Sequence, residues 1–147
     1  VLHNRTGDRI SVWEDWNSWG YYCLRLELRD QSGRTFHVKK RSRAWTRNFP
    51  QATTVGPHGT HVLNLRLGQE VWQGLPTRPE PPEDWMPLEM RAIYENNRSR
   101  SWDEEDDIGW GMARIEGVWT GRAASEWVPV WLWQALPDPV WSRFDDL

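Results

Sequence analysis

The histidines are the first residues in this sequence whose spacing could carry chemistry. His58 and His61 flank a Pro-Gly turn, so a hairpin could hold a metal ion between their rings. Zinc sites use three or four protein ligands, and no carboxylate or thiol stands close in the sequence to complete this pair. We therefore interpret both as solvent-facing turn residues. With His3 and His37 standing alone, we expect no metal site and no cofactor.

Cys23 is the single cysteine of the chain. One thiol excludes an internal disulfide framework and any multi-cysteine metal cluster. A nucleophilic cysteine needs a histidine base and an accessible, electropositive environment, and no such signature surrounds Cys23. We expect a packed thiol with no catalytic role.

Paired carboxylates could act as acid and base or bind calcium, and the run from Asp103 to Asp107 contains five of them. A calcium loop needs spaced oxygen ligands around a bend-forming glycine. Gly109 and Gly111 are close by, but the spacing is not that of an EF-hand, so a solvated loop is favoured and calcium stays an alternative. The sequence also lacks a Gly-x-Ser-x-Gly elbow and a Gly-rich phosphate loop. We expect a protein that is not an enzyme.

Aromatic and arginine side chains are the unusual part of the composition, with 13 tryptophans among 147 residues. The core of one domain of this size cannot hold them all, so several should be at least partly exposed. Arg25 and Arg29 fall on the polar side of one predicted strand, where arginine and tryptophan can form cation–π stacks. Trp127, Trp131 and Trp133 share a face of the last predicted strand. The other face of that strand is also apolar, so both faces need cover.

A binding surface is predicted where two aromatic loop segments, 14–21 and 41–50, follow the first strands at the same end of the fold. Tryptophan, tyrosine and arginine are the residues most enriched at interface hot spots. The predicted binding residues are Trp16, Asn17, Trp19, Tyr21, Trp45, Arg47, Asn48 and Phe49. In the rival interpretation, the tryptophans Trp16, Trp19 and Trp45 plug the open end of the fold and bind nothing.

Period-two alternation predicts the strands that would position these loops. It is cleanest at 22–30, where leucines and charged residues alternate, and 34–40 returns as its hairpin partner with Lys39 and Lys40 counted among the outward residues. Segment 53–55, a turn and 60–67 predict a second hairpin. Further strands are predicted at 8–13, 88–95, 112–119 and 127–133, and helix is limited to one turn near 69–74.

This pattern predicts an all-β, immunoglobulin-like antiparallel β-sandwich of seven to nine strands. We expect one domain over 1–136, with a proline-rich loop at 74–87, an acidic loop at 96–111 and an irregular tail at 137–147. A net charge of −3 argues against nucleic acid as a partner. No apolar run is long enough to span a bilayer. Because residue 1 is Val, we expect a processed chain or a fragment, with a signal or anchor upstream.

Four segments carry a resemblance to known proteins: 16–22, 43–50, 90–95 and 117–122. Together they resemble an uncharacterised, tryptophan-rich bacterial family that is similar in layout to secreted or membrane-anchored immunoglobulin-like domains. The resemblance covers roughly residues 1 to 133 and implies a sandwich and an exported chain. It implies no activity.

These observations predict a non-enzymatic, extracytoplasmic (periplasmic or envelope-associated) protein-interaction module, an accessory or structural subunit of a larger assembly. The alternative is a carbohydrate-binding module, in which coplanar rings of Trp19, Tyr21 and Trp45 would form the sugar platform. A protease inhibitor acting through the 74–87 loop is a third class.

Overall fold

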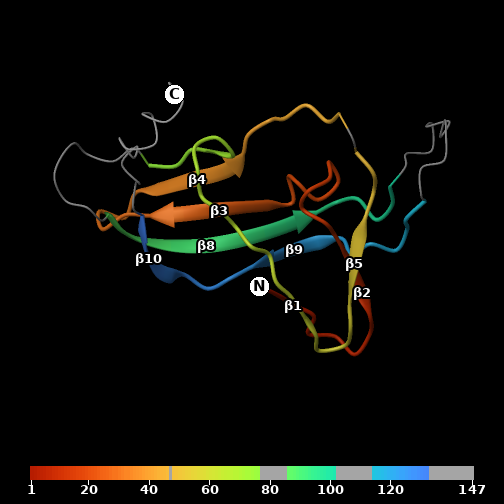
Figure 1. Ribbon diagram of the computed structural model, residues 1–147. Helices are drawn as coiled ribbons and strands as arrows, with labels where there is room; N and C mark the ends of the chain where they lie inside the picture. Colours follow the sequence, from red (N-terminus) through yellow and green to blue (C-terminus); the bar gives the residue numbers. More distant parts are fainter. Residues whose placement is uncertain (47, 77–85, 102–113, 133–147) are drawn as a thin grey trace, which may run out of the picture.

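The part of the chain that the structure describes folds into ten β-strands and contains no helix (Figure 1). The computed structural model describes residues 1–46, 48–76, 86–101 and 114–132. The strands are β1 (Leu2–His3), β2 (Ile10–Trp13), β3 (Leu24–Arg29), β4 (Thr35–Lys40), β5 (Ala52–Val55), β6 (Thr60–His61), β7 (Trp72–Gln73), β8 (Met86–Asn96), β9 (Gly121–Ala124) and β10 (Val128–Leu132). The all-β prediction is confirmed. The count exceeds the predicted seven to nine because β1, β6 and β7 have two residues each, too few to show alternation.

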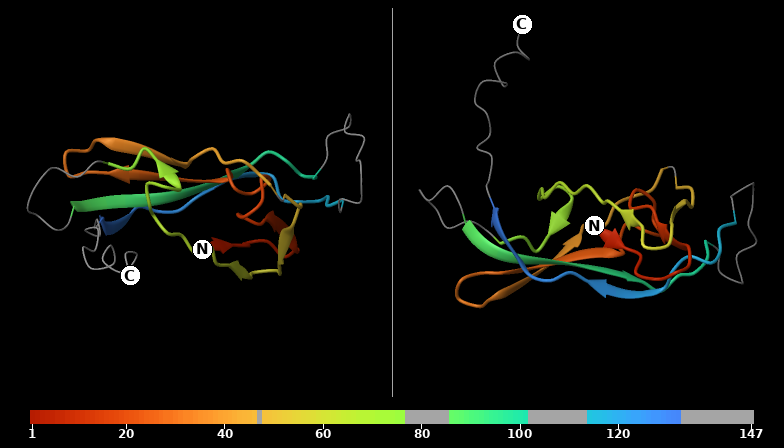
Figure 2. Two further views of the ribbon diagram at one scale, coloured as in Figure 1. Left: turned by 45° about the horizontal axis from the view of Figure 1, so that its top comes forward. Right: turned by 90° about the horizontal axis from the view of Figure 1, so that it is seen from below.

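One six-stranded antiparallel sheet organises the molecule. Its order is β10-β8-β3-β4-β7, and β9 pairs with the far end of β8. Two small sheets, β1–β6 and β2–β5, lie on one side of it (Figure 2). The large sheet therefore has an inner face, which these segments cover, and an outer face.

β3 shows why the sequence forms this sheet. Its leucines, Leu24, Leu26 and Leu28, are buried on the inner face, while Arg25 and Arg29 point outward. Directly paired residues of neighbouring strands share a face, so the leucines meet apolar residues of β4 and β8. Strand 22–30 and its partner at 34–40 were therefore correctly predicted.

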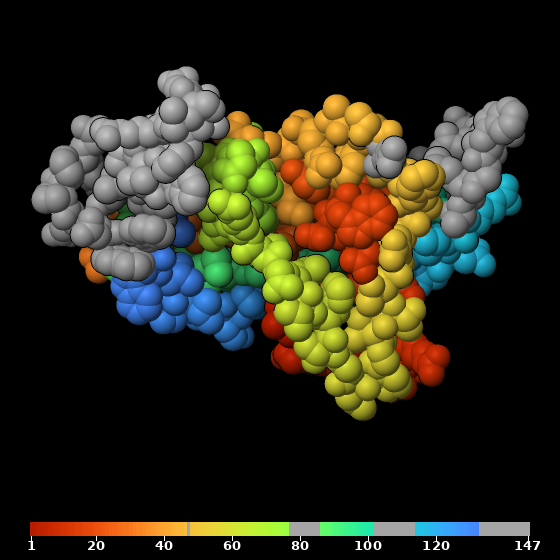
Figure 3. Space-filling model, in the orientation of Figure 1, coloured from red at the N-terminus to blue at the C-terminus, as the bar shows by residue number. Residues whose placement is uncertain are grey.

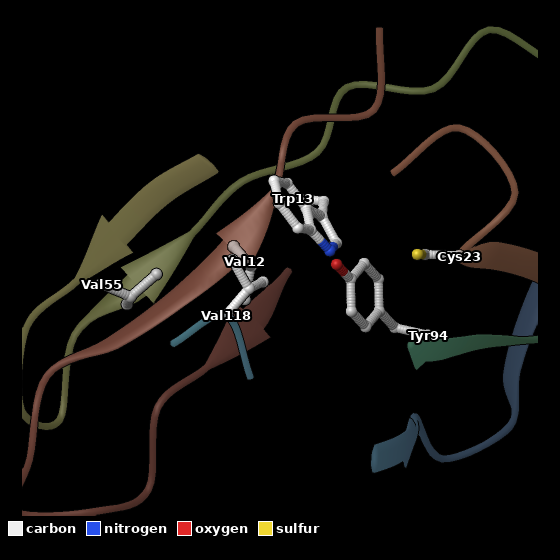
Figure 4. Packing of buried hydrophobic residues seen from close by; sticks show 6 residues of the cluster. All are labelled: Val12, Trp13, Cys23, Val55, Tyr94 and Val118. Atoms are coloured by element: carbon white, nitrogen blue, oxygen red, sulfur yellow. The ribbon is translucent and has the colours of Figure 1, made fainter. Parts of the chain in front are cut away.

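The buried side chains form two clusters along the inner face. One surrounds Trp13 and Tyr94, which face each other beside Cys23 (Figure 4). The other contains the β3 leucines and Trp72, and Leu63 packs against both. The packed state expected for Cys23 is confirmed, because its thiol is buried and burial raises its pKa.

Two strand predictions were wrong in the described residues. The turn after β5 does not return as its hairpin partner: β5 pairs with β2, and β6 pairs with β1. Beyond His61 the chain leaves the extended ladder. In 114–119 the structure has only an isolated bridge between Ser11 and Val118.

Residues 77–85 of the proline-rich loop, 102–111 of the acidic loop and the 137–147 tail lie outside the described residues.

Paired charged side chains cover the outer face of the large sheet. Arg25 pairs with Glu95 at 2.6 Å and Arg29 with Glu89 at 2.6 Å. Arg91 pairs at 2.5 Å with Glu27, which is buried beneath it. The guanidinium carbons of Arg29 and Arg91 also lie 4.5 and 4.8 Å from the ring centre of Trp127. The predicted arginine–tryptophan stacking is thus confirmed for Arg29, whereas Arg25 is held in its ion pair with Glu95.

Candidate functional site

The two predicted binding segments do lie side by side, because two hydrogen bonds and a ring contact join them. The Ser18 backbone N–H donates to Oδ1 of Asn48 at 2.9 Å, and the Asn48 amide donates to the Ser18 hydroxyl at 2.7 Å. The rings of Tyr21 and Trp45 meet edge to face at 5.3 Å. Figure 3 shows the two segments as adjoining red-orange and light-orange areas on one face.

Asn17 is fully buried and organises the first loop from inside. Its side-chain amide donates to the Gln51 carbonyl at 3.0 Å, and its Oδ1 accepts the backbone N–H groups of Trp19 and Gly20, both at 3.1 Å. Gly20 is required for this turn, because a Cβ there would collide with the backbone of Glu14. Asn17 therefore positions the surface and cannot touch a partner.

Lys40 fixes the same loop to the sheet. It stands on the inner face of β4 and is buried, although the sequence analysis counted it among the outward residues. Its ammonium lies 3.3 Å from Oδ2 of Asp15 and 4.5 Å from the ring centre of Tyr21. Burial lowers the pKa of Lys40, and the Asp15 carboxylate opposes that shift. The prediction failed because a lysine beside a carboxylate and a ring can occupy a core position.

The remaining predicted site residues divide into buried and exposed groups. Tyr21 is buried beneath Tyr22, Trp45 and Arg43. Trp19 is half-buried against the Trp13 cluster and donates its indole N–H to the Ser101 carbonyl at 3.0 Å. Trp19 therefore packs against the core. Arg47 lies outside the described residues.

We define the aromatic–arginine surface as four residues of the two segments: Arg43 and Trp45, which contact the ring of Tyr21, and the exposed Trp16 and Phe49. Trp16 and Phe49 are 44% and 60% exposed. The guanidinium carbon of Arg43 lies 4.5 Å from the ring centre of Trp45, which leaves the edges of the guanidinium available for hydrogen bonds. Arg43 was not among the predicted binding residues. An arginine two residues before a loop tryptophan was the available signal.

A pocket of about 360 Å³ opens between the end of the 14–21 segment, which we call the Asn17 loop, and the end of β8. Its lining includes the predicted Trp19 and also Tyr22, Arg25 and Glu95, which the sequence analysis did not select. Tyr22 was missed because it stands next to Tyr21, and burial separates the two rings only in the folded chain.

Three further observations on the described residues concern metal ligands, membrane-spanning helices and the predicted sugar platform. In these ranges no group of three or more His, Cys, Asp and Glu side chains could hold a metal ion. Nor do they contain a helix long and apolar enough to cross a bilayer. Tyr21 and Trp45 are nearly perpendicular, at 86°, so they do not form the coplanar sugar platform expected from the sequence.

The chain was compared with protein-family models, with curated proteins and with solved structures, and none of them matches it. The function of the site therefore has to be argued from its own geometry.

Proposed function

We propose that this chain is a non-enzymatic, extracytoplasmic protein-interaction module, an accessory or structural subunit of a larger assembly. The observation that carries the proposal is the aromatic–arginine surface, in which two hydrogen-bonded loop segments present two exposed rings and an arginine already stacked on tryptophan. Interface hot spots are enriched in these residue types. A protein partner offering apolar side chains and carboxylates would match them.

Rigidity beneath the surface supports the same function. Asn17, Asn48 and Lys40 hold both loops through buried or half-buried contacts. Side chains ordered before binding lose less conformational entropy when a partner arrives. A surface built to be rigid, with apolar rings left in solvent, is typical of a preformed interface.

Location and finer topology are part of the proposal. Export rests on the resemblance to secreted immunoglobulin-like domains, and the immunoglobulin-like arrangement itself rests on antiparallel strands in two unequal layers. Cell fractionation with a tagged full-length chain tests the first, because recovery in the cytoplasm would contradict it.

Site-specific photo-crosslinking in the native cell tests the interaction. A photoreactive amino acid at position 16 or 49 should give one discrete crosslinked protein. The same group at the exposed Val62, which is outside the surface, should give none. Equal crosslinking from all three positions, or none from 16 and 49, would contradict the proposal.

A further inference from the structure

The pocket at the end of β8 has a composition of its own. It lies where the Asn17 loop approaches the last residues of β8 and those that follow. Ser18, Trp19, Tyr22, Cys23, Arg25, Glu95, Asn96, Asn97 and Arg98 line it. Most of these side chains are polar or charged, and Cys23 and Asn96 are buried. Its volume of about 360 Å³ lies within the range of small-molecule sites.

Two aromatic side chains contribute to the lining. Trp19 is fixed by its indole hydrogen bond to Ser101. Tyr22 is 51% exposed, yet its ring is held edge to face on Tyr21 at 4.9 Å. Ring faces carry negative charge density that attracts polarised C–H groups. Fixed rings in a polar pocket suit a ligand with C–H groups on one face and hydroxyls at its edge.

An ion pair between β3 and β8 supplies both hydrogen-bond donors and acceptors to the pocket. Arg25 and Glu95 are paired at 2.6 Å, and about half of each side chain is exposed. Arg122 lies 4.0 Å from the same carboxylate. Arg98 also lines the pocket, so its charged side chains are two guanidinium groups and one carboxylate. Neutral hydroxyls can accept from the Arg25 guanidinium and donate to the Glu95 carboxylate without breaking their pair, whereas an anion would have to compete with Glu95 for Arg25.

We propose that this pocket binds a neutral saccharide, with Tyr22 stacking on the sugar ring and the Arg25–Glu95 pair bonding to adjacent hydroxyls. The site shares Trp19 with the platform predicted from the sequence, but its other residues differ from that platform. It does not depend on the protein-interaction proposal, because no member of the aromatic–arginine surface lines it.

Titration of the ¹⁵N-labelled full chain with defined sugars tests this. The probes are methyl glucoside, methyl mannoside, methyl galactoside and N-acetylglucosamine, with glucuronate as the charged comparison. At least one neutral sugar should shift the amide signals of Tyr22 and Asn97 saturably and bind more tightly than glucuronate.

Two variants locate the site. Tyr22→Ala and Glu95→Gln should each weaken binding about tenfold or more, whereas Val62→Ala, at an exposed residue outside both the pocket and the aromatic–arginine surface, should leave it unchanged. Both altered side chains are about half exposed, so neither change should unfold the chain. The proposal is overturned by tighter binding of glucuronate, by unchanged binding in both pocket variants, or by no saturable shift at about 10 mM sugar.

Discussion

Asn17 should contribute more to stability than its place in a surface loop indicates. Asn17→Ala removes three hydrogen bonds made by one fully buried side chain. The Gly20 N–H then stays buried without a partner, which costs about 1–3 kcal/mol. The Trp19 backbone N–H is only part-buried, so losing its hydrogen bond costs about 0.5–1 kcal/mol of stability. The Gln51 carbonyl still accepts a hydrogen bond from the Glu14 N–H at 3.0 Å, so losing the bond from the Asn17 amide adds little.

The sum is a destabilisation of about 3 kcal/mol, which in a chain of this size lowers the Tm by roughly 6–12 °C. Urea unfolding followed by tryptophan fluorescence measures the free energy directly. Asn97→Ala is the matched control, because Asn97 is exposed, and it should change stability by less than about 0.5 kcal/mol. A loss below about 1 kcal/mol for Asn17→Ala would refute the inference that its amide holds the loop.

Three further changes test the packing. Tyr94→Phe should leave stability unchanged or raise it by up to about 1 kcal/mol, because the Tyr94 hydroxyl is buried without a hydrogen-bond partner among the described residues. A loss of stability in urea unfolding would contradict this prediction. Trp127→Ala should lower the free energy of unfolding by about 1–3 kcal/mol, because it removes two guanidinium contacts. Trp131 is 62% exposed, so Trp131→Ala should lower it by less than about 0.5 kcal/mol. Equal losses of stability on thermal unfolding would contradict this prediction. Because burial lowers the pKa of Lys40 below 10.5, the unfolded chain binds more protons between that lowered pKa and 10.5. The stability of the unaltered chain should therefore rise with pH in that window relative to Lys40→Met, and a flat difference in urea unfolding up to about pH 10 would argue against it.

Local alternation was enough to predict the centre of the sheet. In β3 and β4 the side chains repeat every two residues, so the inner leucines and the outer arginines could be assigned before any partner strand was known. Which strands pair at long range could not be assigned. The turn after β5 carries a strong local signal, yet it connects strands of two different sheets.

The candidate site was predictable as a place and less so as a set of contacts. Strand order placed the two loop segments together, as the Ser18–Asn48 hydrogen bonds report. Burial of Asn17 could not be predicted, because an asparagine that satisfies backbone groups from inside a loop looks like any exposed loop asparagine. Lys40 offered a usable signal, since it continues the inner-face spacing of Phe36 and Val38.

The affinity of the purified full-length chain for the protein crosslinked at position 16 tests the central claim most directly. Trp16→Ala and Arg43→Ala should each weaken binding by about 2 kcal/mol, or roughly 30-fold, with no change in Tm. Val62→Ala, an exposed apolar residue outside the surface, should bind as the unaltered chain does. Unchanged affinity in both surface variants, or equal weakening by Val62→Ala, would contradict the account.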